Sequence, residues 1–238
     1  MADTAKLNLP LLAPSQAQKH VTVNEALGRL DAAVQLSVLT RGDNTPPVTP
    51  VEGDVYLVAP GGVNAWAGQD GNVAVYQNGG WIFLVPRIGW LAYVVDEGVR
   101  IAFDGADWQD GAIAVAPGGS TFQLKINEFD FNVTAGASSS TGFEILPNTV
   151  VFGVTGRVID DITGTLTTFR LGVGGSDDRY GSGLGTAQNS SLRGLTGTPL
   201  TYYSATELLL TAEGGTFDGN GTVRMAVHYV ELGLPKLV

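Results

Sequence analysis

The chain has 238 residues, no cysteine and a formal net charge of −10, and 44% of its residues are hydrophobic. It is long enough to bury a sizeable core as one large or two smaller domains. The absence of cysteine excludes disulfides, thiolate zinc sites and a cysteine nucleophile. The negative charge, with no basic cluster in the sequence to offset it, argues against nucleic-acid binding.

The N-terminal segment has no basic region followed by a long apolar stretch. Its apolar part, residues 7–13, is far shorter than the roughly 18 apolar residues of a membrane span. We therefore expect no signal peptide and no membrane insertion.

The first predicted element is a helix over residues 23–40. Five hydrophobic residues recur at helical spacing and form one stripe: Val23, Leu27, Leu30, Val34 and Val38. Thr22 and Glu25 have the spacing of a capping box, and Gly42 is a stop signal. A single helix must cover such a stripe, either on a neighbouring β domain or on copies of itself. We predict self-association through these residues into a cyclic homo-oligomer, a trimer or a pentamer.

A proline-rich linker over residues 44–50 precedes a predicted strand over residues 54–58. Two similar segments follow, Tyr76 to Trp81 and Phe103 to Trp108. In each, an aromatic residue is followed by a glycine-containing turn and then by tryptophan, which is typical of a β-hairpin. These elements predict an N-terminal domain over residues 1–115, made of the helix and a small β meander and used for attachment and oligomerisation.

The second half alternates between hydrophobic and polar residues over several short segments separated by glycine-rich turns. This pattern predicts an antiparallel β-sandwich of jelly-roll type over residues 120–238. The fold class is therefore mainly β, with one N-terminal helix. Residues 174–193 interrupt the alternation, and we expect them to form a long, irregular loop of the kind that is usually functional or flexible.

Catalytic residues are not predicted. The two histidines, His20 and His228, have no nucleophile on a rigid turn beside them, and Ser182 lies in a glycine-rich context. Asp160 and Asp161 are adjacent, and adjacent residues of a strand point to opposite faces, so they rarely act as an acid/base pair. We predict that they lie in a turn. We expect the protein not to be an enzyme.

Metal and cofactor sites are not predicted either. The segment Asp218-Gly-Asn-Gly221 matches part of a calcium loop but lacks the remaining ligands and the final glutamate. The glycines between Gly172 and Gly175 lack the lysine or the helix that a phosphate-binding loop requires.

The predicted loop contains two carboxylates, a guanidinium and an aromatic ring in succession: Asp177, Asp178, Arg179 and Tyr180. Carboxylates accept hydrogen bonds from sugar hydroxyls, and an aromatic ring covers the apolar face of a sugar. We therefore predict a sugar-binding site here, with Tyr202 and Tyr203 as stacking partners. An equally weighted alternative is that these charged residues form salt bridges, which order the segment without binding a ligand.

Two stretches also resemble known sequences. The segment Pro10-Leu-Leu-Ala-Pro-Ser-Gln-Ala-Gln-Lys-His-Val-Thr-Val-Asn-Glu-Ala-Leu27 and the later Pro50-Val-Glu-Gly-Asp-Val-Tyr-Leu-Val58 resemble an uncharacterised family of virion-associated proteins of alphaproteobacterial prophages and gene transfer agents. This resemblance covers roughly residues 1–113. The segments Asp178-Arg-Tyr-Gly-Ser-Gly-Leu-Gly185 and Leu208-Leu-Leu-Thr-Ala-Glu-Gly-Gly215 are similar to a module that often follows it.

The resemblance implies a non-enzymatic head-spike or fibre protein. Its second domain would contact capsular or other surface polysaccharide of the host, and its first domain would contact other virion proteins. It also implies synthesis in the cytoplasm and release by lysis within a phage-like particle. A polysaccharide depolymerase is the alternative, and a purely structural virion component is the third hypothesis. The resemblance supplies no catalytic residues.

Overall fold

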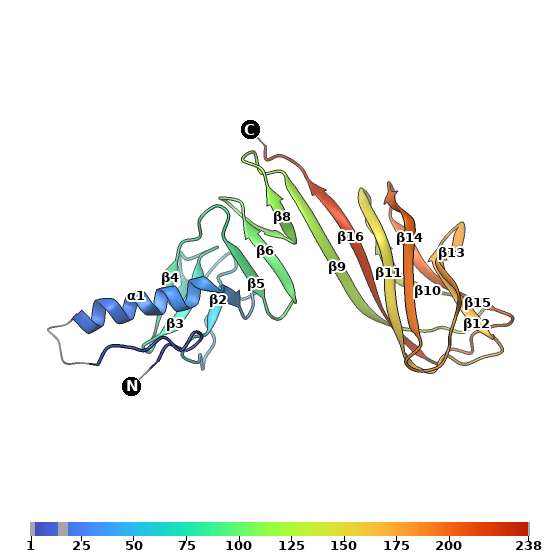
Figure 1. The fold of residues 1–238 in the computed structure, drawn as a ribbon, viewed down its shortest axis with the longest axis horizontal. Coiled ribbons are helices and arrows are strands. Elements are labelled where there is room, and N and C mark those ends of the chain that lie inside the picture. The colour runs from blue at the N-terminus through green and yellow to red at the C-terminus, as the bar shows by residue number, and fades with distance from the viewer. Residues whose placement is uncertain (1–2, 14–18, 238) are drawn as a thin grey trace. The chain divides into compact units, whose positions relative to one another are not determined.

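The computed structural model describes residues 3–13 and 19–237 and divides the chain into two compact units, Met1–Gly119 and Ser120–Val238. Most of the regular structure in the described residues is β, and their one α-helix lies near the N-terminus (Figure 1). The predicted fold class, mainly β with an N-terminal helix and antiparallel sheets, is confirmed. No helix in the described part of the chain is long and apolar enough to cross a membrane.

The first unit contains the α-helix, a short 3-10 helix and eight short strands. Their bounds are α1 Lys19–Val34, β1 Ser37–Val38, β2 Val55–Leu57, η1 Asn64–Trp66, β3 Val73–Gln77, β4 Gly80–Leu84, β5 Leu91–Val94, β6 Val99–Phe103, β7 Trp108–Asp110 and β8 Ala112–Val115. One sheet has the order β2-β3-β4 and another the order β1-β5-β6-β7. Strand β1 runs parallel to β5, whereas the other pairs in these two sheets are antiparallel.

Both predicted hairpins of the first unit are confirmed. Strands β3 and β4 pair Tyr76 with Trp81 around a turn in which Asn78 and Gly79 have φ of 52° and 74°. Two successive positive φ angles are the requirement of the hairpin turn that asparagine–glycine pairs favour. Strands β6 and β7 form the second hairpin, from Phe103 to Trp108.

The helix ends earlier than the spacing predicts. It spans Lys19–Val34, so Thr22 lies inside it and does not cap it, and Gly42 does not end it. Val38 belongs to β1, where it pairs with Val94 and is fully buried. The parallel pairing of β1 with β5 removes Val38 from the predicted stripe, because tertiary packing overrides helical spacing there.

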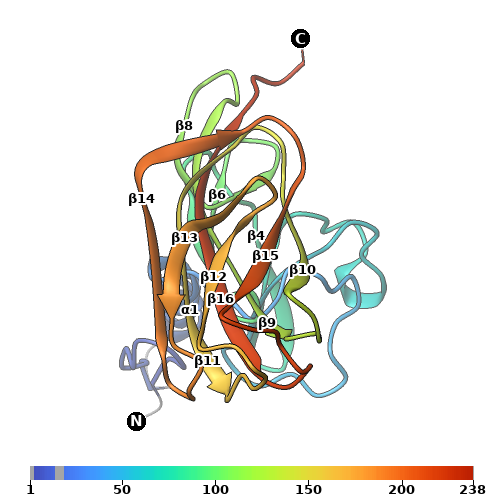
Figure 2. The ribbon, with the colours of Figure 1, turned by 90° about the vertical axis from the view of Figure 1, so that its right-hand side faces the viewer.

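The second unit is a sandwich of two antiparallel sheets (Figures 1 and 2). Its strands are β9 Thr121–Asn132, β10 Ser138–Ile145, β11 Thr149–Asp160, β12 Thr168–Val173, β13 Ser176–Leu184, β14 Ser191–Tyr202, β15 Thr206–Glu213 and β16 Thr222–Gly233. One sheet has the order β10-β15-β12-β13, and within this unit the other has the order β14-β11-β16-β9. Strand β16 lies between β11 and β9 and pairs with β9 along its whole length.

The core of the second unit lies between the two sheets. Alternate residues of each strand point inward, as the alternation of hydrophobic residues predicts. Five of the fully buried ones come from four different strands: Val151, Leu171, Leu208, Val223 and Met225.

The long irregular loop predicted over residues 174–193 is wrong. Gly174 and Gly175 form a tight turn, and Ser176–Leu184 continues as β13, which pairs with β12. Gly181 and Gly183 have φ of 140° and 64°, and the register between β12 and β13 shifts twice. These irregularities explain why the segment lacks a regular hydrophobic alternation although it forms a strand.

Candidate functional site

The predicted stacking role of Tyr180 and Tyr202 is wrong. Their side chains are buried, with exposed fractions of 1% and 6%. Their hydroxyl oxygens are 2.7 Å apart and share a hydrogen bond inside the core. Burial, together with this hydrogen bond, raises the pKa of Tyr180 well above its ordinary value. The two rings are therefore core residues and cannot cover a sugar.

The other predicted sugar-site residues do not converge on one place. Asp177 accepts a hydrogen bond of 3.1 Å from Arg170, whose Nε also donates to Glu213 at 2.8 Å. This contact favours the salt-bridged alternative for Asp177. Asp178 is exposed, and Tyr203 is 83% exposed at the end of β14.

Arg179 lines a shallow hollow beside the segment Leu195–Leu200 of β14. Its Nε is buried and has no hydrogen-bond partner in the described part of the chain. Arg179 therefore contacts different neighbours from Asp177, although only one residue separates them.

His228 is hydrogen-bonded locally, because its Nε2 lies 2.8 Å from the Oγ1 of Thr155. The side chain of His20 lies outside the described residues. No group of histidine, aspartate or glutamate side chains in the described part of the chain could hold a metal ion.

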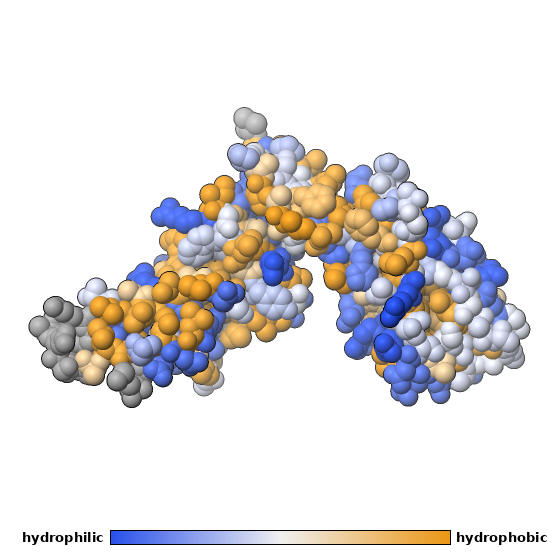
Figure 3. Space-filling model, viewed as in Figure 1, coloured by the Kyte–Doolittle hydropathy of each residue, from blue (hydrophilic) through white to orange (hydrophobic). Residues whose placement is uncertain are grey.

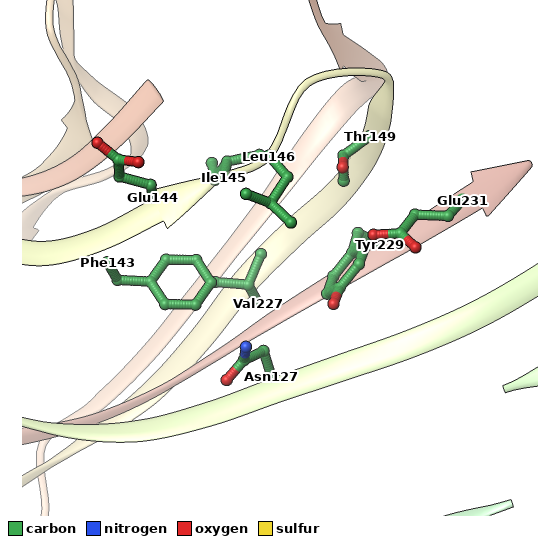
Figure 4. A pocket seen from close by; sticks show the side chains of 9 residues that line it. All are labelled: Asn127, Phe143, Glu144, Ile145, Leu146, Thr149, Val227, Tyr229 and Glu231. Carbon is green, nitrogen blue, oxygen red and sulfur yellow. The ribbon is translucent and has the colours of Figure 1, made fainter. Parts of the chain in front are cut away.

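The second unit contains a cavity of about 150 Å³ between its two sheets. Its lining comes from β9, β10, β11, β16 and the turn after β10 (Figure 4): Asn127, Phe143, Glu144, Ile145, Leu146, Thr149, Val227, Tyr229 and Glu231. Strands β9 and β16 supply alternate residues of their inner faces, and β10 covers them from the other sheet. The cavity therefore results from the packing of the sandwich and not from a single motif.

A tight turn places the two chain segments that close the cavity. Asn148, between β10 and β11, has φ of 63°, a left-handed conformation that asparagine adopts more readily than most residues. Its N–H donates a hydrogen bond of 2.7 Å to the carbonyl of Tyr202. The turn carries Leu146 on one side of the cavity and Thr149 on the other (Figure 4).

One wall of the cavity is apolar. The ring of Phe143 stacks on that of Phe129, with centroids 4.6 Å apart and planes inclined by 5°. Val227 and Ile145, both buried, complete this wall. The stacked rings hold a flat hydrophobic surface of the kind that contacts the apolar face of a small ligand.

Polar groups lie opposite this wall. The carboxylate of Glu231 accepts a hydrogen bond of 2.6 Å from Lys125, and both side chains are about three-quarters buried, with exposed fractions of 26% and 23%. Figure 4 shows Glu231 beside Tyr229, and Thr149 above them. The Oγ1 of Thr149 is buried and has no partner in the described part of the chain, and the residue is only 2% exposed.

An unpartnered buried hydroxyl costs free energy unless a ligand or a water satisfies it. The cavity therefore combines an aromatic wall, a carboxylate and an available hydroxyl. This set suits a small ligand that has one apolar face and several hydroxyl groups. The sequence alone could not indicate it, because its residues are spread over about one hundred positions and carry no motif.

Comparisons with known proteins give one family and several solved structures. A family described as "Protein of unknown function (DUF2793)" matches residues 23–109, and no curated protein matches the chain. A chain of the cyanophage Pam1 capsid asymmetric unit is 27% identical, and the alignment covers 50% of this chain and 94% of that one with a TM-score of 0.37.

Two further structures are similar over half of the chain. A chain of the acid-stable capsid of Helicobacter pylori bacteriophage KHP30 is 17% identical, with coverages of 49% and 90% and a TM-score of 0.28. A chain of the Bacillus endospore appendages, described as disulfide-linked pili, is 14% identical, with coverages of 50% and 96% and a TM-score of 0.25. Residues 23–109, inside the first unit, are thus similar to a family whose description gives no function.

Proposed function

We propose that this protein is a non-enzymatic structural component of a phage-like particle, a spike or fibre that assembles through its first unit and binds host surface saccharide through its second. The observation that carries the proposal is an exposed hydrophobic face on α1, the element whose sequence resembles virion-associated proteins. The cavity in the second unit supports the saccharide part.

The helix packs on the first unit through small and polar residues. Ala32 and Asp31 are 2% and 5% exposed, whereas the larger side chains of Val23, Leu30 and Val34 are 40% to 50% exposed. Figure 3 shows hydrophobic atoms gathered over α1. Leu27, on the same stripe, is partly exposed. A contiguous hydrophobic face of this kind is typical of a protein–protein interface.

The origin and location of the particle rest on the sequence resemblance. We place the protein in the virion of a prophage or gene transfer agent, made in the cytoplasm and released by lysis. The helix stripe then binds other copies, as a trimer or pentamer, or a neighbouring virion protein. These assignments are testable separately from the saccharide binding.

The first experiment localises the protein. Antibodies against the full chain, applied to purified particles in immunoelectron microscopy, should label discrete positions on the particle surface. Particles that lack the protein, while the soluble lysate contains it, would contradict the virion role.

The second experiment tests the helix face. Leu30→Glu and Val34→Glu place a carboxylate on the exposed stripe, and we expect them to dissociate the oligomer in a solution mass measurement. Thr22→Glu, on the exposed flank of the same helix, adds the same charge off the stripe and is the matched control. A wild-type protein that stays monomeric at high concentration would contradict self-association and leave a different virion protein as the partner.

The third experiment separates binding from catalysis. The full chain is incubated with purified host surface polysaccharide, and both bound protein and released reducing ends are measured. We expect binding without turnover. Turnover would support the depolymerase alternative, whereas the absence of any binding would leave the purely structural role.

A further inference from the structure

We infer that the outer face of the sheet formed by β14, β11 and β16 is a second binding site, specific for an acidic saccharide such as a hexuronate. The inference deepens the proposed function, because it names the ligand class of a saccharide-binding second unit. The site is a shallow hollow of about 420 Å³ whose rim includes Arg157, Arg193 and Arg224.

This hollow and the cavity of Figure 4 lie on opposite faces of the same sheet. Val227 points inward and lines the cavity, whereas its neighbour Ala226 points outward and lines the hollow. Ala226 pairs with Thr155 of β11, and these two small side chains form the floor. The rim side chains are longer, so the hollow is open to solvent above its floor.

The strand register brings the three arginines together. Arg157 of β11 is directly opposite Arg224 of β16. Arg193 of β14 is opposite Thr155, one inter-strand step from the floor. Directly opposed side chains have their Cβ atoms about 5 Å apart, and like charges at that separation destabilise a sheet. The sheet therefore concentrates positive charge at one place, although the chain has a net charge of −10.

Among the described residues, carboxylates form ion pairs with one of the three arginines, Arg224. Arg224 donates two hydrogen bonds, of 2.7 and 2.8 Å, to Asp130 and lies 4.0 Å from Glu128. Arg157 donates to a backbone carbonyl, that of Asn189, at 2.9 Å. Within the described residues neither Arg157 nor Arg193 forms an ion pair with a carboxylate. These two guanidinium groups are available to an external anion.

The residues that line the hollow favour a sugar acid over other anions. A guanidinium binds a carboxylate through two parallel N–H···O bonds, which gives geometric specificity. The hydroxyls of Thr155 and Ser191 and the carboxylate of Glu128 lie on the same hollow and can exchange hydrogen bonds with sugar hydroxyls. The deoxyribose-phosphate backbone of DNA has no free sugar hydroxyls along its length to bond with these groups, which disfavours it relative to a sugar acid.

The test is isothermal titration calorimetry of the full chain with oligogalacturonate, with maltohexaose as the neutral probe and a thymidine oligonucleotide as the phosphate probe. We expect binding of the uronate only, weakened by added salt. Arg193→Gln and Arg157→Gln should each weaken it by about tenfold or more, because each removes a charged hydrogen-bond donor. Arg87→Gln, an exposed arginine of the first unit, is the matched control and should have no effect.

Equal binding of the neutral and acidic saccharides, unchanged binding by both arginine variants, or equal binding of the oligonucleotide would each overturn the inference. Circular dichroism spectra of the variants confirm that they fold. Because Arg157 and Arg193 are exposed, their replacement should leave the sandwich intact. If the wild-type protein decorates particles and binds host polysaccharide but not uronate, the proposed function stands and only this inference fails.

Discussion

Replacing Thr149 by valine should stabilise the second unit and weaken the binding of a ligand in the cavity. Thr149 is 2% exposed, and its Oγ1 has no hydrogen-bond partner within the described residues. Valine has the same branched shape, so the substitution removes the hydroxyl without opening a new void. The folded, unliganded protein would no longer bury an unsatisfied polar group.

The expected size follows from the cost of that hydroxyl. Burying a hydroxyl without a partner costs about 1–3 kcal/mol in proteins, so Thr149→Val should raise the free energy of unfolding of the second unit by roughly 1–2 kcal/mol. A ligand that donates to the hydroxyl should lose about 1 kcal/mol of binding free energy, or about fivefold in affinity. Higher stability and lower affinity together would identify the hydroxyl as a ligand-binding group.

The two units can be followed separately in one denaturation experiment. All four tryptophans, Trp66, Trp81, Trp90 and Trp108, belong to the first unit. Tryptophan fluorescence therefore reports the unfolding of the first unit, and far-ultraviolet circular dichroism reports both. Thr149→Val should raise the guanidinium midpoint of the dichroism transition and leave the fluorescence midpoint unchanged.

Thr141→Val is the matched control, because the Oγ1 of Thr141 donates a hydrogen bond of 2.8 Å to the carbonyl of Leu208. That variant loses a hydrogen bond and should destabilise the second unit by about 1 kcal/mol. If Thr149→Val is also destabilised, the Thr149 hydroxyl has a partner in solution, and the reasoning about the cavity is refuted.

Three further predictions concern buried ionisable groups. Tyr180→Phe leaves the hydroxyl of Tyr202 without a partner and should cost about 1–3 kcal/mol, measured by the same dichroism titration. Burial raises the pKa of Tyr180, so above its ordinary value of 10.0 the unfolded chain loses a proton that the folded chain keeps. Stability should therefore fall as the pH rises above 10, by up to about 1.4 kcal/mol per pH unit, and Tyr180→Phe should lack this contribution. Although burial opposes ionisation, hydrogen bonds from the Thr4 hydroxyl and the Leu7 N–H lower the pKa of Asp31. The first unit should thus lose stability as the pH falls through 3.8 and below, and Asp31→Asn, followed by tryptophan fluorescence, should show a weaker acid dependence.

Local chemistry made part of the fold predictable. The Asn78–Gly79 turn requires positive φ at both positions, and this requirement alone identifies the hairpin of β3 and β4. The helical spacing of Val23, Leu27, Leu30 and Val34 likewise indicated the helix, although it begins at Lys19, before the predicted cap. Its end was not, because Val38 pairs with a strand more than fifty residues away in the sequence.

The candidate site was predicted less well than the fold. The segment from Asp177 to Tyr180 has the composition of a polar loop, but a glycine-broken strand carries Tyr180 into the core. The cavity and the arginine hollow each combine residues from several strands, and only the register of those strands reveals them. Such sites depend on long-range pairing, which alternation within one segment does not specify.

The position of β16 has a consequence for biosynthesis. This strand, Thr222–Gly233, lies between β11 and β9, so the sheet has a gap at its centre until the strand has left the ribosome. Contacts that join β9 to β16 span about a hundred residues, and pairings of such separation form slowly. The first unit can complete its sheets during translation, whereas the sandwich must wait for the last strand. A ribosome that stops before residue 222 therefore releases a chain with a folded first unit and an incomplete sandwich, so premature termination removes the second unit while the first unit persists.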